Sequence, residues 1–254
     1  MLLAIDVGNT QTVIGVFEKD SLQEHWRIST NKEETADEFA IVLNDLLPLK
    51  GLKLSNIEAV IISSVVPHCT AALQEMTLKN LKLEPLVVGP GLKTGLPILY
   101  DNPHEVGADR IVNSVAAYEL YGGPVIVVDF GTATTFDVVS GQGEYLGGAI
   151  APGIEVSTEA LFSAAARLSR VDLMAPKKVI GKNTQSSVQS GVIFGSAGLV
   201  DALVKRIRQE LKTDAKVVAT GGLAELMIPH CATITEINPM LTLVGLKKIY
   251  DRNG

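Results

Sequence analysis

The sequence predicts an α/β fold of two similar domains, each a mixed β-sheet flanked by helices. The first observation behind this prediction is an internal repeat. Residues 2–17 (LLAIDVGNTQTVIGVF) match residues 125–140 (VIVVDFGTATTFDVVS) at an offset of 123 residues. The second is the order of the predicted elements, because each half continues with a third strand and then alternates helices and strands. The third is the length, since 254 residues can form one or two domains with a core in each.

The repeat places the same residue types at the turns of two predicted β-hairpins. The matched positions are Asp6 with Asp129, Gly8 with Gly131, Thr12 with Thr135 and Val16 with Val139. We therefore expect each domain to open with a hairpin. The boundary is expected near Tyr121–Pro124, where two glycines and a proline would end a helix. This gives an N-terminal domain at residues 1–121 and a C-terminal domain at residues 122–254.

The first half continues with a predicted third strand at residues 24–29 and a helix at residues 36–47. Thr35 and Glu38 have the spacing of a capping box, which fixes the start of that helix. A buried strand at residues 59–63 follows, then a helix entered through Pro67 and a short strand at residues 86–88. The strands and helices predicted in the first half are enough to form a β-sheet covered by helices.

The second half repeats this plan after its own hairpin. A third strand is predicted at residues 145–151, followed by helices at residues 154–166 and 188–211. A strand at residues 216–219 and a final helix at residues 240–250 complete the half. Both halves are thus predicted to have the same architecture.

The composition argues against a membrane protein, a nucleic-acid-binding protein and a disulfide-rich protein. The apolar runs are only strand-sized, such as Val125–Val128, so we expect neither a membrane-spanning helix nor a signal peptide. The 22 Lys and Arg are outnumbered by 28 Asp and Glu, which argues against a nucleic-acid partner. The two cysteines, Cys69 and Cys231, are far apart in the sequence, which favours a reducing cytoplasm over a disulfide framework.

The two Asp-Gly turns are the first candidate site. A tight turn rich in Gly and Thr presents backbone N–H groups that can hold phosphate oxygens. Asn9, Thr10 and Gln11 add side-chain donors in the first turn, and Thr132 and its neighbouring threonines add them in the second. Carboxylates beside a polyphosphate require a cation between them, so the turns indicate a metal–nucleotide site. The alternative is that both aspartates only shape hairpin turns, but their matching positions favour the first interpretation.

Other nucleotide-binding motifs are missing from the sequence. Gly89-Pro90-Gly91 lacks the continuation of a Walker A loop, and no GxGxxG follows a strand and opens a helix. The glycines of Thr220-Gly221-Gly222 would let an adenine approach the backbone, or they belong to an ordinary strand-to-helix turn. The sequence therefore excludes P-loop and Rossmann sites.

The connector at residues 89–106 is the second candidate site. It holds three prolines and leads into Gly107-Ala108-Asp109-Arg110 before an apolar helix, and an irregular connector of this length is often functional. Asp109 either caps that helix or acts as a base that removes a proton, with Arg110 beside it to bind an anion. The residues alone leave both alternatives open.

These motifs resemble a known family. DVGNT (Asp6–Thr10), DFGTATT (Asp129–Thr135) and TGG (Thr220–Gly222) resemble the phosphate and adenosine motifs of the actin, sugar-kinase and acetate-kinase superfamily. Within it, GLPILYDNP (Gly95–Pro103) followed by GADR (Gly107–Arg110) is most similar to the substrate loop of type III pantothenate kinases. The resemblance spans essentially the whole chain.

The resemblance implies two ribonuclease-H-like domains with the active site in the cleft between them. It also implies a kinase that phosphorylates pantothenate with ATP to 4'-phosphopantothenate, the first step of coenzyme A biosynthesis. By resemblance, Asp109 is the general base. The implied ATP and phosphate contacts are Asp6, Val7, Gly8, Asn9, Thr10, Gln11, Thr12, Val13 and Thr132. The implied pantothenate contacts are Tyr100, Gly107, Ala108, Asp109, Arg110 and Thr184.

The resemblance implies two cations and a partner subunit. Asp6 would organise Mg²⁺ through water, and Asp129 would bind K⁺ or NH₄⁺ beside the phosphates. Members of the family form homodimers, so we expect a homodimer in the cytoplasm with neither a membrane nor a nucleic acid as a partner. Two other functions remain open, namely a nucleotide-binding regulator on the same fold and a kinase for another small molecule. An intact Asp109 favours an enzyme, because a regulator has no use for a base.

Overall fold

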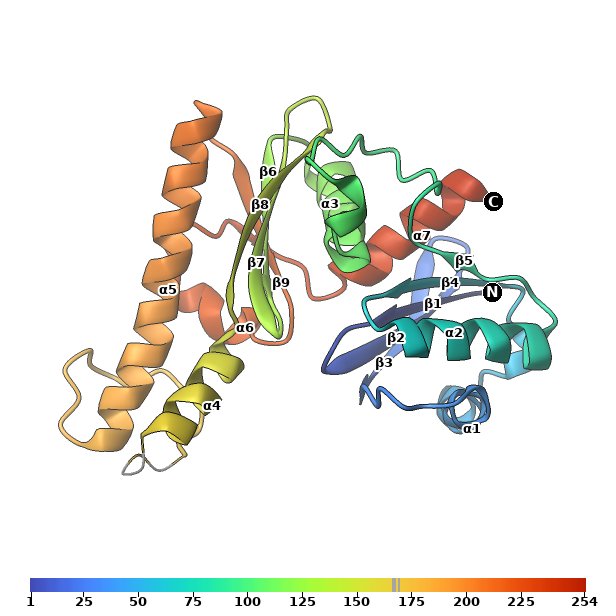
Figure 1. Ribbon diagram of the computed structural model, residues 1–254, viewed down its shortest axis with the longest axis horizontal. Helices are drawn as coiled ribbons and strands as arrows, with labels where there is room; N and C mark the ends of the chain where they lie inside the picture. The colour runs from blue at the N-terminus through green and yellow to red at the C-terminus, as the bar shows by residue number, and fades with distance from the viewer. Residues whose placement is uncertain (166–167, 169) are drawn as a thin grey trace. The chain divides into compact units, whose positions relative to one another are not determined.

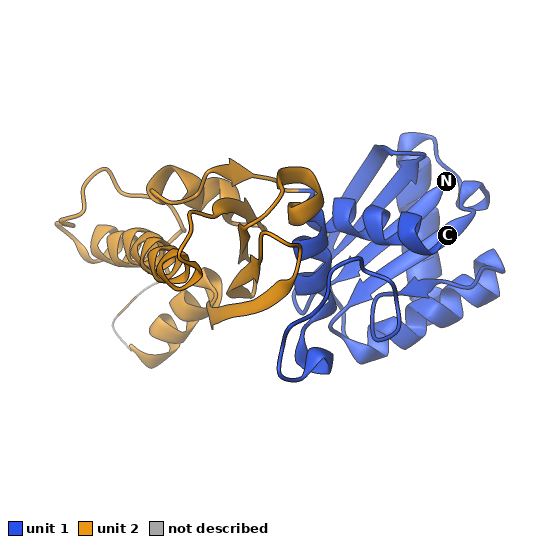
Figure 2. Cartoon of the chain, turned by 90° about the horizontal axis from the view of Figure 1, so that it is seen from above, with its two compact units in different colours: residues 1–116, 240–254 blue, residues 117–239 orange. Residues whose placement is uncertain are grey.

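The structure, a computed structural model, describes residues 1–165, 168 and 170–254. The chain divides into two compact units, one of residues 1–116 with 240–254 and one of residues 117–239 (Figure 2). Helix α3 (Ala108–Tyr121) runs across this division and ends at Tyr121, where the sequence predicts a helix end. The predicted α/β class is confirmed, because each unit holds a mixed sheet of five strands with helices.

The first unit is built on a sheet with the strand order β3-β2-β1-β4-β5. The strands are β1 (Leu2–Val7), β2 (Gln11–Glu18), β3 (Ser21–Ser29), β4 (Ala59–Ser64) and β5 (Leu86–Val87). β1, β4 and β5 are parallel, whereas β2 runs antiparallel to β1 and β3. Helices α1 (Ala36–Leu46) and α2 (Pro67–Met76) pack beside each other along this sheet (Figure 1). The predicted capping box of Thr35 and Glu38 is confirmed at the start of α1.

The two faces of the first sheet are covered by different helices. Leu3, Ile5 and Val7 join Phe39 of α1 and Leu73 of α2 in one hydrophobic cluster. The alternate residues of β1 point to the opposite face. Helix α7 (Leu241–Asn253) contacts β1, β2 and β4 there.

Helix α7 therefore belongs to the first unit, although it comes last in the sequence. The compact units differ in this respect from the two contiguous halves expected at residues 1–121 and 122–254. The physical reason is apolar burial. Leu241, Leu243 and Leu246 are almost fully buried, and Gly15 of β2 leaves room for the Leu243 side chain.

The sheet of the second unit has the strand order β8-β7-β6-β9-β10, which corresponds strand by strand to β3-β2-β1-β4-β5 in the first unit. Its strands are β6 (Val125–Phe130), β7 (Ala133–Val139), β8 (Tyr145–Pro152), β9 (Lys216–Thr220) and β10 (Glu236–Ile237). Its helices are α4 (Ile154–Ala164), α5 (Thr184–Leu211) and α6 (Ala224–Met227). Ile126, Val128 and Phe130 of β6 pack with these helices, so Asp129 points to the opposite face.

Most predicted elements are confirmed within a few residues, and the differences have local causes. Helix α5 begins at Thr184 rather than Val188, because Asn183 and Ser186 form a capping box at its start. The sequence predicts a helix at residues 154–166, whose last residue, Ala166, lies outside the described residues. The helix that the structure describes there, α4, ends at Ala164. The short turns are η1 (Leu47–Lys50), η2 (Leu54–Asn56), η3 (Thr77–Leu81), η4 (Pro103–Glu105) and η5 (Ile228–His230).

Helix α5 is long and apolar enough to cross a membrane by length and composition alone, and it is the one such helix among the described residues. The core helix of a water-soluble protein passes the same test. Here Ile193, Ala197, Val200 and Val204 recur every three or four residues, which is the spacing of one helical face. They all lie in the hydrophobic cluster of the second unit, so one face of α5 is a core face.

Candidate active site

The first Asp-Gly turn connects β1 and β2. The Gly8 N–H donates a hydrogen bond to the Gln11 carbonyl at 3.0 Å, which closes the turn. Thr30, just after β3, braces it from the side. Its N–H donates to the Thr10 carbonyl at 2.9 Å, and its hydroxyl donates to the Gly8 carbonyl at 2.8 Å. Thr30 was not predicted as part of this turn, since nothing in the neighbouring sequence marks it.

The predicted phosphate residues of this turn differ in exposure. Asn9, Thr10 and Gln11 are exposed at its tip. Val7 and Thr12 are buried, and the Thr12 hydroxyl lies 2.9 Å from that of Thr30. A phosphate can therefore reach the side chains at the tip, whereas Val7 has only its backbone to offer.

Asp6 lies on the sheet face opposite the cluster formed with α1 and α2. Its antiparallel partner is Val13 and its parallel partner is Ser63, so these three side chains lie beside one another on one face. The Oδ1 atom of Asp6 and the Oγ atom of Ser63 are both buried. The sequence predicts the aspartate, but Ser63 becomes its neighbour only through the register of β1 and β4.

The structure brings the GADR segment to the carboxyl ends of the same two strands. The Val65 N–H donates to the Val7 carbonyl at 3.0 Å, so Val65 continues the β1–β4 pairing. A Cβ placed on Gly107 would lie 3.7 Å from Cγ1 of Val65 and 2.6 Å from Oδ1 of Asp109. Val65 is thus shared by the first turn and the GADR segment.

Asp109 lies in the first turn of α3, where the sequence predicts it, and the structure shows that it is half-buried. Its Oδ1 accepts a hydrogen bond from the Arg110 N–H at 2.8 Å. Burial raises the pKa of the Asp109 carboxyl, and this desolvation outweighs the hydrogen bond and the positive charge that Arg110 provides. A half-buried carboxylate with a raised pKa is suited to accept a proton from a hydroxyl.

The other predicted substrate residues of the first unit come from the connector and from the GADR segment. Arg110 is buried, with 8% of its surface exposed, whereas Tyr100, Gly107 and Ala108 are half-buried. A hollow of about 370 Å³ lies at the end of β4. It is lined by Ser64, Val65, Pro67, Thr70, Ala71 and Gln74.

The second Asp-Gly turn connects β6 and β7, and the Gly131 N–H closes it onto the Ala133 carbonyl at 3.1 Å. Thr132 is exposed at its tip. Gly153, the N-cap of α4, packs on this turn and donates its N–H to the Thr132 carbonyl at 3.2 Å. The start of α4 therefore lies against the turn. Since a helix N-terminus favours anions, this contact supports a phosphate site beside Thr132.

Asp129 lies against the TGG segment that follows β9. A Cβ on Gly221 would collide with Oδ1 of Asp129 and with the backbone of Phe130. The φ of Gly221 is +93°, which also favours glycine. The sequence suggested two reasons for the glycines, room for an adenine or a plain turn. The structure adds a third, which is room for the Asp129 carboxylate.

A second carboxylate lies on the same face of this sheet. Asp137 of β7 is fully buried and accepts hydrogen bonds from the Tyr145 hydroxyl at 2.8 Å and the Thr135 hydroxyl at 3.1 Å. Thr135 is the antiparallel partner of Asp129. Asp137 was not predicted as a site residue, although an aspartate inside an apolar strand is a usable signal.

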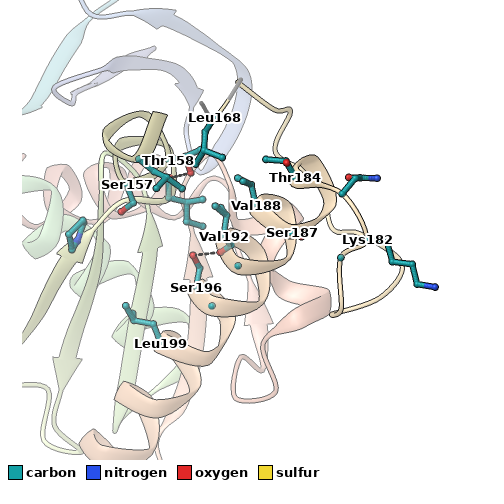
Figure 3. Close-up of a pocket in the computed structure, with 17 residues that line it drawn as sticks. Ser157, Thr158, Leu168, Lys182, Thr184, Ser187, Val188, Val192, Ser196 and Leu199 are labelled. Carbon is teal, nitrogen blue, oxygen red and sulfur yellow. Dashed lines mark hydrogen bonds between the residues drawn. The ribbon is translucent and has the colours of Figure 1, made fainter. Parts of the chain in front are cut away.

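Thr184 lies in the second unit at the start of α5, and its side chain is exposed. It lines a pocket of about 1020 Å³ between α4 and α5, which also includes Ser157, Lys182, Val188 and Ser196 (Figure 3). The lining of the pocket combines apolar side chains with hydroxyl groups, which is typical of small-molecule sites.

No group of three or more His, Cys, Asp or Glu side chains that could hold a metal ion occurs within the described part of the chain. Mg²⁺ in nucleotide sites is usually held by one or two carboxylates together with water and phosphate oxygens. Asp6 and Asp129, each beside a turn, fit that kind of site. The expected cleft between the domains stays a prediction.

The two five-stranded sheets and their hairpin turns define a fold class, which the chain shares with sugar kinases of known structure. The structure is similar to that of the ROK hexokinase from Thermus thermophilus, with a TM-score of 0.55, 13% identity and coverage of 100% and 99% of the two chains. It is also similar to a structure described as a Baf family transcriptional activator from Campylobacter jejuni, with a TM-score of 0.60, 23% identity and coverage of 99% and 98%. Likeness at such identities shows the fold alone.

Sequence comparison identifies the family. The type III pantothenate kinase family profile matches residues 2–206. The chain is 55% identical to a type III pantothenate kinase from Moorella thermoacetica over 253 residues, which cover 100% of both chains. It is 54% identical to one from Geobacter sulfurreducens, with coverage of 100% and 99%. The chain belongs to the type III pantothenate kinase family.

Proposed function

We propose that this chain transfers the γ-phosphoryl group of ATP to the primary hydroxyl of pantothenate and so catalyses the first step of coenzyme A biosynthesis. The hydroxyl oxygen forms a bond to the γ-phosphorus while the bond to the β–γ bridging oxygen breaks, and ADP leaves. The hydroxyl proton passes to the Asp109 carboxylate. Catalysis otherwise comes from alignment and from charge neutralisation.

The observation that carries this proposal is the place of Asp109. Its turn packs on Val65, which is hydrogen-bonded to the end of β1 just before the first Asp-Gly turn. A carboxylate with a raised pKa is therefore held near a turn that can hold phosphate. A protein that only binds nucleotides would gain nothing from keeping this carboxylate desolvated, because its burial costs free energy.

The ATP phosphates are proposed to contact the first turn and Thr132 of the second. Gly8 lets a phosphate approach the backbone closely. The side chains of Asn9, Thr10 and Gln11 are exposed there as donors. Thr12 and Val7 are buried, and the side chain of Val13 is apolar, so these three residues offer mainly their backbone groups to the nucleotide.

Pantothenate is proposed to contact Tyr100 and the segment Gly107–Arg110 in the first unit and Thr184 in the second. Arg110 suits the carboxylate of pantothenate, since a guanidinium binds carboxylates through paired hydrogen bonds. The pocket beside Thr184 supports this assignment, because it offers hydroxyl and apolar surface to a small amphipathic ligand.

Two cations complete the proposed site. Asp6 would organise a Mg²⁺ ion through water, and the metal supplies charge neutralisation at the phosphates when it is bound. Asp129 is proposed to bind K⁺ or NH₄⁺. Its contact with Gly221 supports this role, because the absence of a side chain at Gly221 leaves space for the carboxylate.

The protein is further proposed to be a cytoplasmic homodimer. Cys69 and Cys231 are both free and buried, as expected in a reducing compartment. Val156, Leu161 and Leu199 are exposed apolar residues of α4 and α5, and an apolar surface of this kind suits a subunit interface. Sedimentation analysis at several protein concentrations would test the dimer.

Coupled measurement of ADP release tests the proposed reaction. We expect release with pantothenate, but not with a panel of sugars or acetate, and stronger release in K⁺ than in Na⁺. Asp45→Asn is a matched control for Asp109→Asn, because Asp45 is an exposed carboxylate of α1 in the same unit and lies outside the connector. Absence of pantothenate-dependent ADP release under every cation would exclude the proposal and favour a nucleotide-binding regulator.

A further inference from the structure

The end of α7 holds the connector that leads to Tyr100 and Asp109. The connector begins after β5, and η4 is its only helical turn. α7 comes about 150 residues later in the chain and reaches the connector with its last turn (Figure 1). Two adjacent residues, Arg252 and Asn253, make the contacts.

Asn253 pairs with the backbone of Lys93 in both directions. The Lys93 N–H donates to Oδ1 of Asn253 at 3.1 Å, and Nδ2 of Asn253 donates to the Lys93 carbonyl at 2.9 Å. Nδ2 also donates to the Ile249 carbonyl of its own helix at 2.8 Å. One amide group thus satisfies the donor and the acceptor of a loop residue that has no strand neighbour to do so.

Arg252 covers the connector two residues further on. Gly95 has a φ of +77°, and a Cβ placed on it would collide with the guanidinium of Arg252. The contact therefore requires glycine at this position for room as well as for conformation. Leu96, the next residue, is buried, so the chain enters the protein directly after this contact.

The helix that carries these two residues is itself fixed. Leu246 and Ile249 are fully buried, and Nζ of Lys247 is hydrogen-bonded to the carboxylates of Asp251 and Asp20. The last turn of α7 is therefore anchored to the sheet on one side and to the connector on the other. A rigid element that fixes a loop near a site reduces the entropy lost when the loop orders around a ligand.

We propose that Arg252 and Asn253 are positioning residues for the substrate connector. They act through Lys93 and Gly95 to hold Tyr100 and the GADR segment in the orientation that binds the alcohol substrate. This inference rests on the proposed function, because it takes the connector as the pantothenate-binding segment.

The test compares Asn253→Ala with Asn44→Ala. The Asn44 side chain in α1 likewise donates to the carbonyl four residues earlier, that of Ala40, at 2.8 Å. Within the described residues it makes no hydrogen bond to the connector. We expect Asn253→Ala to raise the KM for pantothenate by roughly 10-fold, with the KM for ATP changed less than about 2-fold. Asn44→Ala should change neither.

Glycine substitutions provide a second pair of variants. Gly91 and Gly95 lie in the same connector and both have positive φ, but nothing lies within 4 Å of a Cβ on Gly91. Alanine imposes backbone strain at both positions, whereas only Gly95→Ala displaces Arg252. A larger rise in the KM for pantothenate with Gly95→Ala than with Gly91→Ala is the expected result.

Trypsin cleavage after the exposed Lys93 gives a readout besides activity. Loss of the Asn253 contacts should release this residue and speed cleavage, as measured by the appearance of the fragment 1–93. Equal cleavage rates in the wild type and Asn253→Ala would overturn the proposal, and so would faster cleavage without a change in the KM for pantothenate. If the wild type does not phosphorylate pantothenate, the proposed function fails, while the cleavage rates still decide whether α7 orders the connector.

Discussion

The carboxylate of Asp129 lies against Gly221, in the space that a side chain at residue 221 would occupy. Asp129 is the next-to-last residue of β6, and Gly221 follows β9, the parallel neighbour of β6 in the sheet. The two residues are far apart in the sequence and are brought together by strand pairing. The DFGTATT and TGG motifs, which are separate in the sequence, therefore form one local structure.

Gly221→Ala should disturb this structure strongly. The added methyl group would collide with Asp129 and the backbone of Phe130 and would force alanine into a positive φ. We expect a loss of about 1–3 kcal/mol in the free energy of unfolding, together with a weaker activation by K⁺. Urea unfolding and ADP release with K⁺ or Na⁺ measure the two effects.

Gly122→Ala is the control for that variant. Gly122 also has a positive φ, +74°, but no atom lies within 4 Å of a Cβ there. It should therefore lose stability through the backbone alone and keep its response to K⁺. A similar loss of the K⁺ response in both variants would contradict the role given to the contact between Asp129 and Gly221.

Asp129→Ala tests the cation site directly. Because the carboxylate is proposed to be the charged ligand of the monovalent cation, its removal should make ADP release equal in K⁺ and Na⁺. Glu144, whose carboxylate accepts a hydrogen bond from Ser140 in the same unit, offers a control as Glu144→Ala. A K⁺ response that persists in Asp129→Ala would place the cation elsewhere.

The sequence predicted the hairpins well because their signals are local. Alternating apolar residues and an Asp-Gly turn lie within sixteen residues in each half. The alignment of the halves beyond the turns was less accurate. Asp6 pairs with Val13, whereas Asp129 pairs with Thr135, so the first turn is one residue longer than the second. The residue that corresponds to Thr12 in the strand register is therefore Thr134 and not Thr135.

The contacts that complete the candidate site could not be predicted, because they depend on tertiary pairing. Ser63 reaches Asp6 through the register of β1 and β4. Thr30 reaches the first turn because β3 ends beside it, and Gly153 reaches the second turn at the start of α4. No local pattern in the sequence contains this information, whereas the motifs themselves can be recognised along the chain.

Asp109→Asn should separate catalysis from stability. Without a base, turnover should fall by roughly 10²–10⁴-fold. The free energy of unfolding at neutral pH should rise, because the variant no longer holds a desolvated carboxylate whose pKa is raised. Turnover within about 2-fold of the wild type would show that Asp109 is not the base, and a less stable variant would contradict the effect assigned to burial.

The pH dependence of the wild type provides the final prediction. In the folded protein, Asp109 holds its proton at a higher pH than in the unfolded chain, where an aspartate has a pKa of about 3.9. The folded state therefore binds more protons in this range. This contribution to stability is fully present below the unfolded pKa and is lost as the pH rises through the folded pKa. The difference in unfolding free energy between Asp109→Asn and the wild type should grow from acidic to neutral pH.

The activity of the wild type should increase with pH over the same range in which its stability falls, because only the deprotonated carboxylate can accept the hydroxyl proton. The control Asp45→Asn should leave both profiles unchanged. An acidic limb of kcat/KM at the ordinary pKa of an exposed aspartate would contradict the raised pKa of Asp109.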